Sequence, residues 1–258
     1  HVGVGDPRQN AWWWDVLRRG RDSAYASFFD IDWSEDNGAD GRIALPVLGS
    51  ADAVQELTVD RTGDEPVLAY YDKRFPIAPG TDDGTPAEIH ARQAYRLVPW
   101  DSGLIGYRRF FTVDDLAAVR VEDPRVFDAV HAQVASWIDD DLVDGLRVDH
   151  PDGLADPSAY LERLRSLIGP QRWLVIEKIL AEGEPLDMTL PVDGTTGYDA
   201  LDELAAVFVD PRGDKALTAV SRTYTGSDGD AAWLHSQERD LKRSVLRSGL
   251  APEVARLA

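Results

Sequence analysis

The sequence predicts an α/β protein in which a parallel sheet with covering helices follows a loop-rich subdomain. Between residues 121 and 210, amphipathic helices alternate with short apolar strands. That order is typical of a doubly wound sheet or a (β/α)₈ barrel. From Ala11 to about Thr112 the sequence is irregular, rich in aromatic residues, glycine and proline, and shows no long helical period. Residues 211–258 return to helical spacing and form a third region.

The first predicted elements lie on both sides of residue 120. Two runs in the irregular region, Glu56–Val59 and Val67–Tyr71, have the composition of short strands. A helix starts at Asp123-Pro124, since a capping carboxylate followed by proline in the first turn is typical of a helix start. A short apolar strand, Gly145–Val148, follows this helix. The helix has one apolar face, made of Phe127, Val130, Val134, Trp137 and Ile138.

The same order then repeats. Asp156-Pro157 starts a second helix, which ends at Gly169. Trp173–Ile176 is a second buried strand, and a third helix extends from Gly197 to about Val209. The apolar face of the second helix consists of Tyr160, Leu161, Leu164, Leu167 and Ile168.

The last region has helical spacing without a stop signal. Gly226–Asp230 is typical of a turn that precedes it. Because the pattern is not closed, and because the chain begins at His1 rather than methionine, we expect an internal piece of a longer protein. The apolar residues that recur on one helical face are Val245, Leu246, Leu250, Val254 and Leu257.

Composition limits the possible partners. A net charge of −19 argues against nucleic acid, which needs clustered lysine and arginine, and it is compatible with a neutral ligand such as a sugar. The charge is explained equally well as a means of staying in solution. The absence of cysteine excludes disulfides and thiolate chemistry. Without a run of 18 apolar residues or a signal-peptide pattern, the sequence predicts a cytoplasmic protein with no membrane partner.

Two carboxylates follow the two predicted strands. In parallel α/β proteins the active site lies at the carboxyl ends of the strands, and these ends hold Asp149 and Glu177. Adjacent strands are about 4.8 Å apart, so the two side chains can face one cavity. Such a pair is what a retaining glycosidase needs as nucleophile and acid/base. Arg147, two residues before Asp149, points the same way and would keep that carboxylate ionised.

Each of these residues also has an ordinary structural interpretation. An aspartate at a strand exit is often a turn residue or helix cap, although Asp152-Gly153 already supplies a turn here and Asp156 a cap. Glu177 with the following lysine has the pattern of a solvated strand end. His150 is more often structural than catalytic.

Other motifs give weaker indications. The tryptophans at 12–14 could stack on sugar rings, but tryptophans more often fill a core. Asp30 and Asp32 in FFDIDW are paired carboxylates without further metal-ligand spacing. The sequence contains no Walker motif, no G-x-G-x-x-G and no G-x-S-x-G.

Several motifs together carry a resemblance to a known family. GLRVDHPDG resembles the Gly-x-Arg-x-Asp signature of the α-amylase superfamily, and WLVIEKIL resembles its glutamate-bearing signature. The longer motifs resemble the branch of glycoside hydrolase family 13 that forms maltooligosyl trehalose. They cover nearly the whole chain and comprise WWWDVLRRGRDSAYASFFDIDW, YRRFF, DGLRVDHPDGLADP and GTTGYD. Gly106 departs from the family, which has asparagine before Tyr-Arg-Arg.

The resemblance implies a fold and a place within a longer chain. It implies part of a (β/α)₈ barrel in which residues 1–120 are inserted after the third barrel strand, residues 121–210 are the central βα units, and residues 211–258 start a helical insertion. His1 would be the histidine that ends the family's first signature and lines the donor subsite. The family's third carboxylate would lie beyond Ala258.

The resemblance also implies an activity and its residues. Asp149 would form the glycosyl-enzyme intermediate with support from Arg147, and Glu177 would act as acid/base. The reaction would convert the reducing-end α-1,4 bond of a maltooligosaccharide or α-1,4-glucan into an α,α-1,1 bond without metal or organic cofactor. His150, Lys178 and Tyr198 would contact the acceptor glucose. A maltooligosyl trehalose trehalohydrolase is the expected functional partner.

Two alternatives remain open from the sequence. The chain could derive from an α-amylase-type hydrolase or another α-glucan transglycosylase, in which water or a different sugar is the acceptor. It could also be an inactive fragment that retains only sugar binding. We expect residues 1–258 alone to have negligible activity, because part of the barrel and one catalytic residue would be missing.

Overall fold

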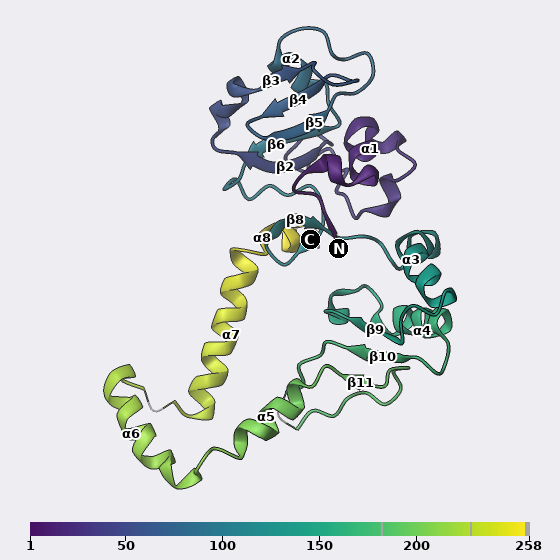
Figure 1. Cartoon of the computed structure of the whole chain (residues 1–258). Helices are drawn as coiled ribbons and strands as arrows, with labels where there is room; N and C mark the ends of the chain where they lie inside the picture. The colour runs from purple at the N-terminus through teal and green to yellow at the C-terminus, as the bar shows by residue number, and fades with distance from the viewer. Residues whose placement is uncertain (182, 228, 256–258) are drawn as a thin grey trace. The chain divides into compact units, whose positions relative to one another are not determined.

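The computed structural model of the chain describes residues 1–181, 183–227 and 229–255 (Figure 1). It divides into two compact units, one of residues 1–120 together with the segment that begins at Ser236, and one of residues 121–235. The structure is mixed helix and strand, which confirms the α/β class. No helix among the described residues is long and apolar enough to cross a bilayer.

The described residues of the first unit form three small sheets. In one, β8 lies between β1 and β7, and in the second, β4 lies between β3 and β5, all antiparallel. In the third, β2 pairs with β6 in parallel. The elements of this unit up to residue 120 are β1 (Val2–Gly3), α1 (Ala11–Arg19), β2 (Ile43–Leu48), β3 (Thr58–Asp60), β4 (Val67–Tyr70), β5 (Lys73–Pro76), α2 (Pro86–Ala91), β6 (Tyr95–Pro99), β7 (Arg109–Phe110) and β8 (Val113–Ala117).

One apolar core joins these elements. Trp13 of α1 is 1% exposed, and its ring lies 4.8 Å from the ring of Phe29 and 5.1 Å from that of Tyr107. Phe75 and Tyr95 are buried in the same cluster. The expected strands near 56–59 and 67–71 are confirmed as β3 and β4 with shifted ends. The expectation of a region without a sustained helix is wrong at α1, where an Asn10 side chain caps nine helical residues.

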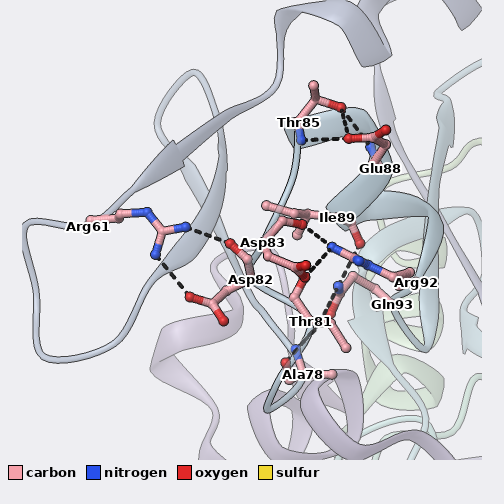
Figure 2. Close-up of polar contacts among 10 residues, drawn as sticks. All are labelled: Arg61, Ala78, Thr81, Asp82, Asp83, Thr85, Glu88, Ile89, Arg92 and Gln93. Carbon is pink, nitrogen blue, oxygen red and sulfur yellow. Dashed lines mark hydrogen bonds and ion pairs between the residues drawn. The ribbon is translucent and has the colours of Figure 1, made fainter.

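Polar contacts fix the loop before α2 (Figure 2). Arg61 donates to the Asp82 carboxylate at 3.0 Å and to its carbonyl at 2.6 Å. Arg92 donates to the backbone carbonyl oxygens of Thr81 and Asp83, and the side-chain Oε1 of Gln93 accepts from the Ala78 amide at 2.7 Å. Side chains therefore satisfy the backbone groups of this loop in place of a regular ladder.

Gly106, where the family that the sequence resembles has asparagine, lies at a place with no room for a side chain. A Cβ there would lie 2.4 Å from the amide nitrogen of Ala44 in β2. The Gly106 amide donates to the Ala44 carbonyl at 3.1 Å, and its own carbonyl accepts from Asp32 at 2.9 Å. An asparagine at this position would require the backbone to move away from β2.

The end of the chain is not one continuous helix. Helix α7 (Ala231–Arg247) ends in a turn closed by the Leu250 amide on the Val245 carbonyl at 3.0 Å, and α8 (Ala251–Ala255) follows. The expected unbroken pattern is therefore wrong here, and Leu257 lies outside the described residues. Arg109, only 7% exposed, fixes α8 to the first unit through Glu253 at 2.9 Å and the Gly249 carbonyl at 2.7 Å.

The second unit is built on a parallel sheet of three strands. The strand order is β11-β10-β9, and both pairings are parallel. Both predicted strands are confirmed with the predicted ends. The elements of the second unit are α3 (Pro124–Asp139), β9 (Gly145–Val148), α4 (Pro157–Ile168), β10 (Trp173–Ile176), β11 (Gly194–Thr195), α5 (Tyr198–Ala206), α6 (Asp214–Thr225) and the start of α7.

The helix starts predicted from the sequence are confirmed. Asp123 accepts from the Arg125 amide at 2.9 Å, and Asp156 accepts from the Ala159 amide at 2.9 Å. Phe127 and Ile138 of α3 and Leu161, Leu164 and Ile168 of α4 pack with Leu174 and Ile176 of β10. Trp137 was expected in this core, but it is 42% exposed, whereas the predicted face omitted the buried His131.

Apolar side chains on the later helices of this unit are open to solvent. Neither α5 nor α6 has a buried residue. Phe208, just after α5, is 89% exposed, and Tyr224 of α6 is 86% exposed. The turn expected over Gly226–Asp230 includes Asp228, which lies outside the described residues, while Gly226 ends α6 in a left-handed conformation with φ of 67°.

Candidate active site

The parallel register brings the two candidate carboxylates to equivalent positions. Val148 pairs with Ile176, so Asp149 and Glu177 are each the first residue beyond their strand. The Glu177 amide donates to the Val148 carbonyl at 2.8 Å. Because alternate residues of a strand share one face, Arg147 and Asp149 lie on the side opposite to Val148.

Arg147 contacts both carboxylates through one nitrogen. Its Nη2 lies 2.8 Å from Asp149 Oδ1 and 3.6 Å from Glu177 Oε1. Asp149 Oδ1 and Glu177 Oε1 can therefore be separated by no more than the two distances combined. This upper limit is slightly below the carboxylate separation of about 6.5 Å at which the range of inverting enzymes begins. The limit is compatible with the separation of about 5–5.5 Å in retaining enzymes.

The three side chains are unequally exposed. Asp149 is 69% exposed, Arg147 53% and Glu177 29%. Ion pairs in such surroundings contribute little to folding, between about 0 and 1 kcal/mol. The contacts of Arg147 therefore orient the two carboxylates more than they stabilise the unit.

Tyr198 reaches the same edge of the sheet from β11 and α5. Gly197, with φ of 93°, turns the chain between the strand and the helix. The Thr195 hydroxyl donates to Asp199 in the first turn of α5 at 2.7 Å, which fixes this junction. Tyr198 Oη lies 3.5 Å from Glu177 Oε1, the outer limit of a hydrogen bond.

His150 occupies a left-handed conformation directly after Asp149. Its φ is 47°, uncommon for a residue other than glycine. The chain continues into a 3₁₀ turn, Pro151–Gly153. A Cβ on Gly153 would lie 2.6 Å from His150 Cδ2, so the imidazole packs against the glycine backbone. The turn expected from Asp152-Gly153 is confirmed.

Lys178 forms a contact that the sequence did not indicate. Its Nζ lies 3.0 Å from Asp152 Oδ2 and 3.3 Å from Oδ1. The pair lines a cavity of about 280 Å³ together with Pro151, Ile176 and Glu184. The sequence indicates only a turn at Asp152, and no local signal links it to a lysine 26 positions further along the chain.

The remaining candidates lie in the first unit. The His1 ring contacts that of Phe110 edge to face at 5.0 Å. Asp30 pairs with Arg108 at 3.1 Å, and Asp32 accepts from the Ser34 hydroxyl at 2.5 Å. No group of three metal-ligating side chains occurs among the residues that the structure describes.

The sequence is similar to curated proteins over its whole length. It is 54% identical over 257 residues to a protein of Mycobacterium tuberculosis named putative maltooligosyl trehalose synthase. The chain spans about a third of the length of the curated relatives that it matches, 32% in each case. No protein-family model matches the chain.

Solved structures give the same result. The maltooligosyltrehalose synthase of Arthrobacter ramosus matches all of the chain with a TM-score of 0.91 and 49% identity, over 33% of its own length. A hypothetical maltooligosyl trehalose synthase of Sulfolobus tokodaii matches 96% of the chain with a TM-score of 0.81 and 33% identity, over 32% of its own length.

The parallel strands with a carboxylate after each lie in a region that matches solved structures of maltooligosyltrehalose synthases. The chain is homologous to proteins named maltooligosyl trehalose synthase, and it corresponds to about a third of their length.

Proposed function

We propose that the chain is part of an enzyme that converts the reducing-end α-1,4 bond of a maltooligosaccharide or α-1,4-glucan into an α,α-1,1 bond. The names of its relatives support the activity. The observation that carries the chemistry is the Arg147 nitrogen at 2.8 Å from Asp149 and 3.6 Å from Glu177, since it joins two carboxylates from neighbouring strand ends.

A (β/α)₈ barrel is the architecture that this proposal requires. Parallel sheets are normally covered on both faces. One face of β10 packs Leu174 and Ile176 against α3 and α4, while Trp173 on the other face is 65% exposed. We propose that further strands of the full-length enzyme cover that face. In this plan residues 1–120 are an insertion after the third strand, 121–210 the central βα units and 211–258 the start of a helical insertion.

Asp149 would be the nucleophile. Its carboxylate attacks the anomeric carbon of the penultimate glucose and forms a covalent glycosyl-enzyme with retention over two steps. Arg147, 2.8 Å away, keeps the attacking carboxylate ionised and turned toward the sugar.

Glu177 would be the acid/base. It first protonates the departing oxygen at C4 of the terminal glucose. It then removes the proton from the anomeric hydroxyl of that same glucose, which attacks the glycosyl-enzyme and releases Asp149. No atom is gained or lost, so a reducing sugar becomes non-reducing without cofactor chemistry.

The freed glucose must be held and turned between the two steps while water is excluded. We assign acceptor contacts to Tyr198, whose hydroxyl lies 3.5 Å from Glu177, and to His150 and Lys178 at the neighbouring strand ends. His1 would contact the donor sugar. A third carboxylate outside residues 1–258 would stabilise the transition state, and we expect this segment alone to be inactive.

Two further expectations are part of the proposal. A maltooligosyl trehalose trehalohydrolase would use the product, since an α,α-1,1-linked chain end is resistant to enzymes that need a reducing end. A cytoplasmic location is the prediction from the sequence. Neither the functional partner nor the location depends on a contact that the described residues make.

The experiment uses the full-length enzyme with maltopentaose. Loss of reducing ends without release of glucose is the expected result. A rise in reducing ends would instead identify an α-amylase-type hydrolase, which is the alternative that the same carboxylate pair allows. Robust turnover by residues 1–258 alone would contradict the expected dependence on the rest of the chain.

A further inference from the structure

Asp152 and Lys178 form a cross-link at the catalytic edge of the sheet. The ammonium lies within 3.3 Å of both carboxylate oxygens. The lysine side chain is 22% exposed, so its long stem is mostly packed, while the aspartate is 58% exposed. A lysine side chain has many rotamers, and the two contacts with the carboxylate restrict the ammonium to one of them.

The turn that carries Asp152 is itself constrained. His150 has φ of 47°, Pro151 follows it, and the Gly153 amide donates to the His150 carbonyl at 3.2 Å. A Cβ on Gly153 would lie 2.6 Å from the His150 imidazole, so a side chain there would require this ring to move. The position of the Asp152 carboxylate is therefore tied to the same short turn that begins at Asp149.

The cross-link joins the two halves of the candidate site. Asp152 is three residues after Asp149, and Lys178 directly follows Glu177. A shift of Lys178 would therefore be transmitted to the strand end that carries the acid/base. The pair has the geometry of a brace between the turn after β9 and the segment after β10.

We propose that Asp152 is a positioning residue that holds Lys178 and, through it, the segment after β10 in which Glu177 faces the acceptor glucose while this sugar is turned. The inference rests on the proposed function of the site. Removal of the carboxylate charge would leave Lys178 free to rotate, so that the freed glucose is held less well and water competes for the glycosyl-enzyme.

The same two strands offer a matched control at their opposite ends. Asp141, before β9, pairs with Arg172, before β10, at 2.8 Å. Asp141 is 89% exposed and Arg172 27%. Asp141 has φ of 55°, a value that asparagine also adopts readily. Asp141→Asn therefore removes the ion pair between the same two strands without backbone strain.

The test compares Asp152→Asn, Asp152→Glu and Asp141→Asn in the full-length enzyme with maltopentaose, measuring transfer, released glucose and thermal midpoint. For Asp152→Asn we expect kcat/KM for transfer to fall about tenfold and the share of hydrolysis to rise, with partial recovery in Asp152→Glu. Asp141→Asn should stay within about twofold of the unaltered enzyme. The double variant Asp152→Asn with Lys178→Met should have the same kcat/KM for transfer as Lys178→Met alone, or a higher one.

Several outcomes would overturn the inference. Normal transfer by the Asp152→Asn variant would contradict this inference and would leave the proposed function of the site unaffected. Equal losses in Asp152→Asn and Asp141→Asn, with parallel drops in thermal midpoint, would reduce Asp152 to a structural role. Multiplicative effects of the two substitutions would show that Asp152 and Lys178 act independently. Absence of transfer by the unaltered enzyme would contradict the proposed function, and the inference with it.

Discussion

The two units differ in how fully they enclose their apolar side chains. In the first unit, helix α1 and the sheets surround one core in which Trp13, Phe29 and Tyr95 are at most 2% exposed. The second unit covers one face of β10 with α3 and α4, but apolar residues such as Phe208, just after α5, lie in solvent. Folding of the first unit therefore rests on its own side chains, whereas the second unit presents strand ends whose side chains are available for chemistry.

The largest expected effect is on catalysis in the second unit. Asp149→Asn in the full-length enzyme should lower kcat by about a thousandfold or more, equivalent to about 4 kcal/mol, because an amide cannot serve as the nucleophile. Since the Asp149 side chain is 69% exposed, the thermal midpoint of the variant should equal that of the unaltered enzyme. A fall in rate of less than about tenfold would contradict the nucleophile assignment.

The same substitution in the two units tests the difference in enclosure directly. Phe29→Ala should lower the free energy of unfolding of the first unit by about 3–5 kcal/mol, since a ring that is 2% exposed leaves a cavity. Phe208→Ala, at 89% exposure, should change the second unit by less than about 0.5 kcal/mol.

Hydrogen–deuterium exchange with urea titration measures the two units of the chain separately. Equal losses in Phe29→Ala and Phe208→Ala would show that the helices after Tyr198 are more enclosed in solution than these exposures indicate.

A smaller effect concerns pH and the first unit. Burial, with a lesser contribution from Arg42 and Arg96, lowers the pKa of His90 from 6.5 to about 4, and its Nε2 accepts from the Leu97 amide at 2.9 Å. The folded state therefore prefers neutral His90. Above pH 6.5 His90 is neutral in both the folded and the unfolded state, so the lowered pKa does not affect stability. As the pH falls from 6.5 to about 4, the histidine is protonated in the unfolded chain but stays neutral in the folded unit, which favours unfolding.

The first unit should accordingly lose up to about 3 kcal/mol of stability across this window, beyond the loss due to carboxylates. His90→Gln can keep an acceptor for Leu97 without the titration, so the difference between the two proteins isolates the histidine. Unfolding free energies from urea titrations at pH 7, 5.5 and 4 measure it. Parallel pH profiles for both proteins would contradict the assignment.

Local signals predicted the elements of the second unit well. Asp123-Pro124 and Asp156-Pro157 are helix starts by chemistry that acts within one turn, and both carboxylates cap as expected. The short apolar runs Gly145–Val148 and Trp173–Ile176 were predicted with their observed ends. In contrast β11 is two residues of Gly-Thr, too short for a periodic signal, and forms because β10 provides an edge to pair with.

Other predictions failed for tertiary reasons. Helix α1 was missed because Trp12–Trp14 break the usual polar and apolar alternation, and only Trp13 is buried in the core. Trp137 satisfies the helical period of α3 but lies at the margin of its packed face, whereas buried His131 bonds the Phe127 carbonyl at 2.7 Å and the Tyr160 hydroxyl at 3.0 Å.

By itself the sequence determined which residues follow the strands. The strand ends and helix caps depend on neighbours in the chain, so Asp149 and Glu177 could be named as candidates from the residues around them. Only the tertiary structure decided what these residues touch. The parallel register aligns Val148 with Ile176. It thereby brings Arg147 into contact with the Asp149 and Glu177 carboxylates, and Asp152 into contact with Lys178. These contacts join residues far apart in the chain, and no local propensity encodes their distance.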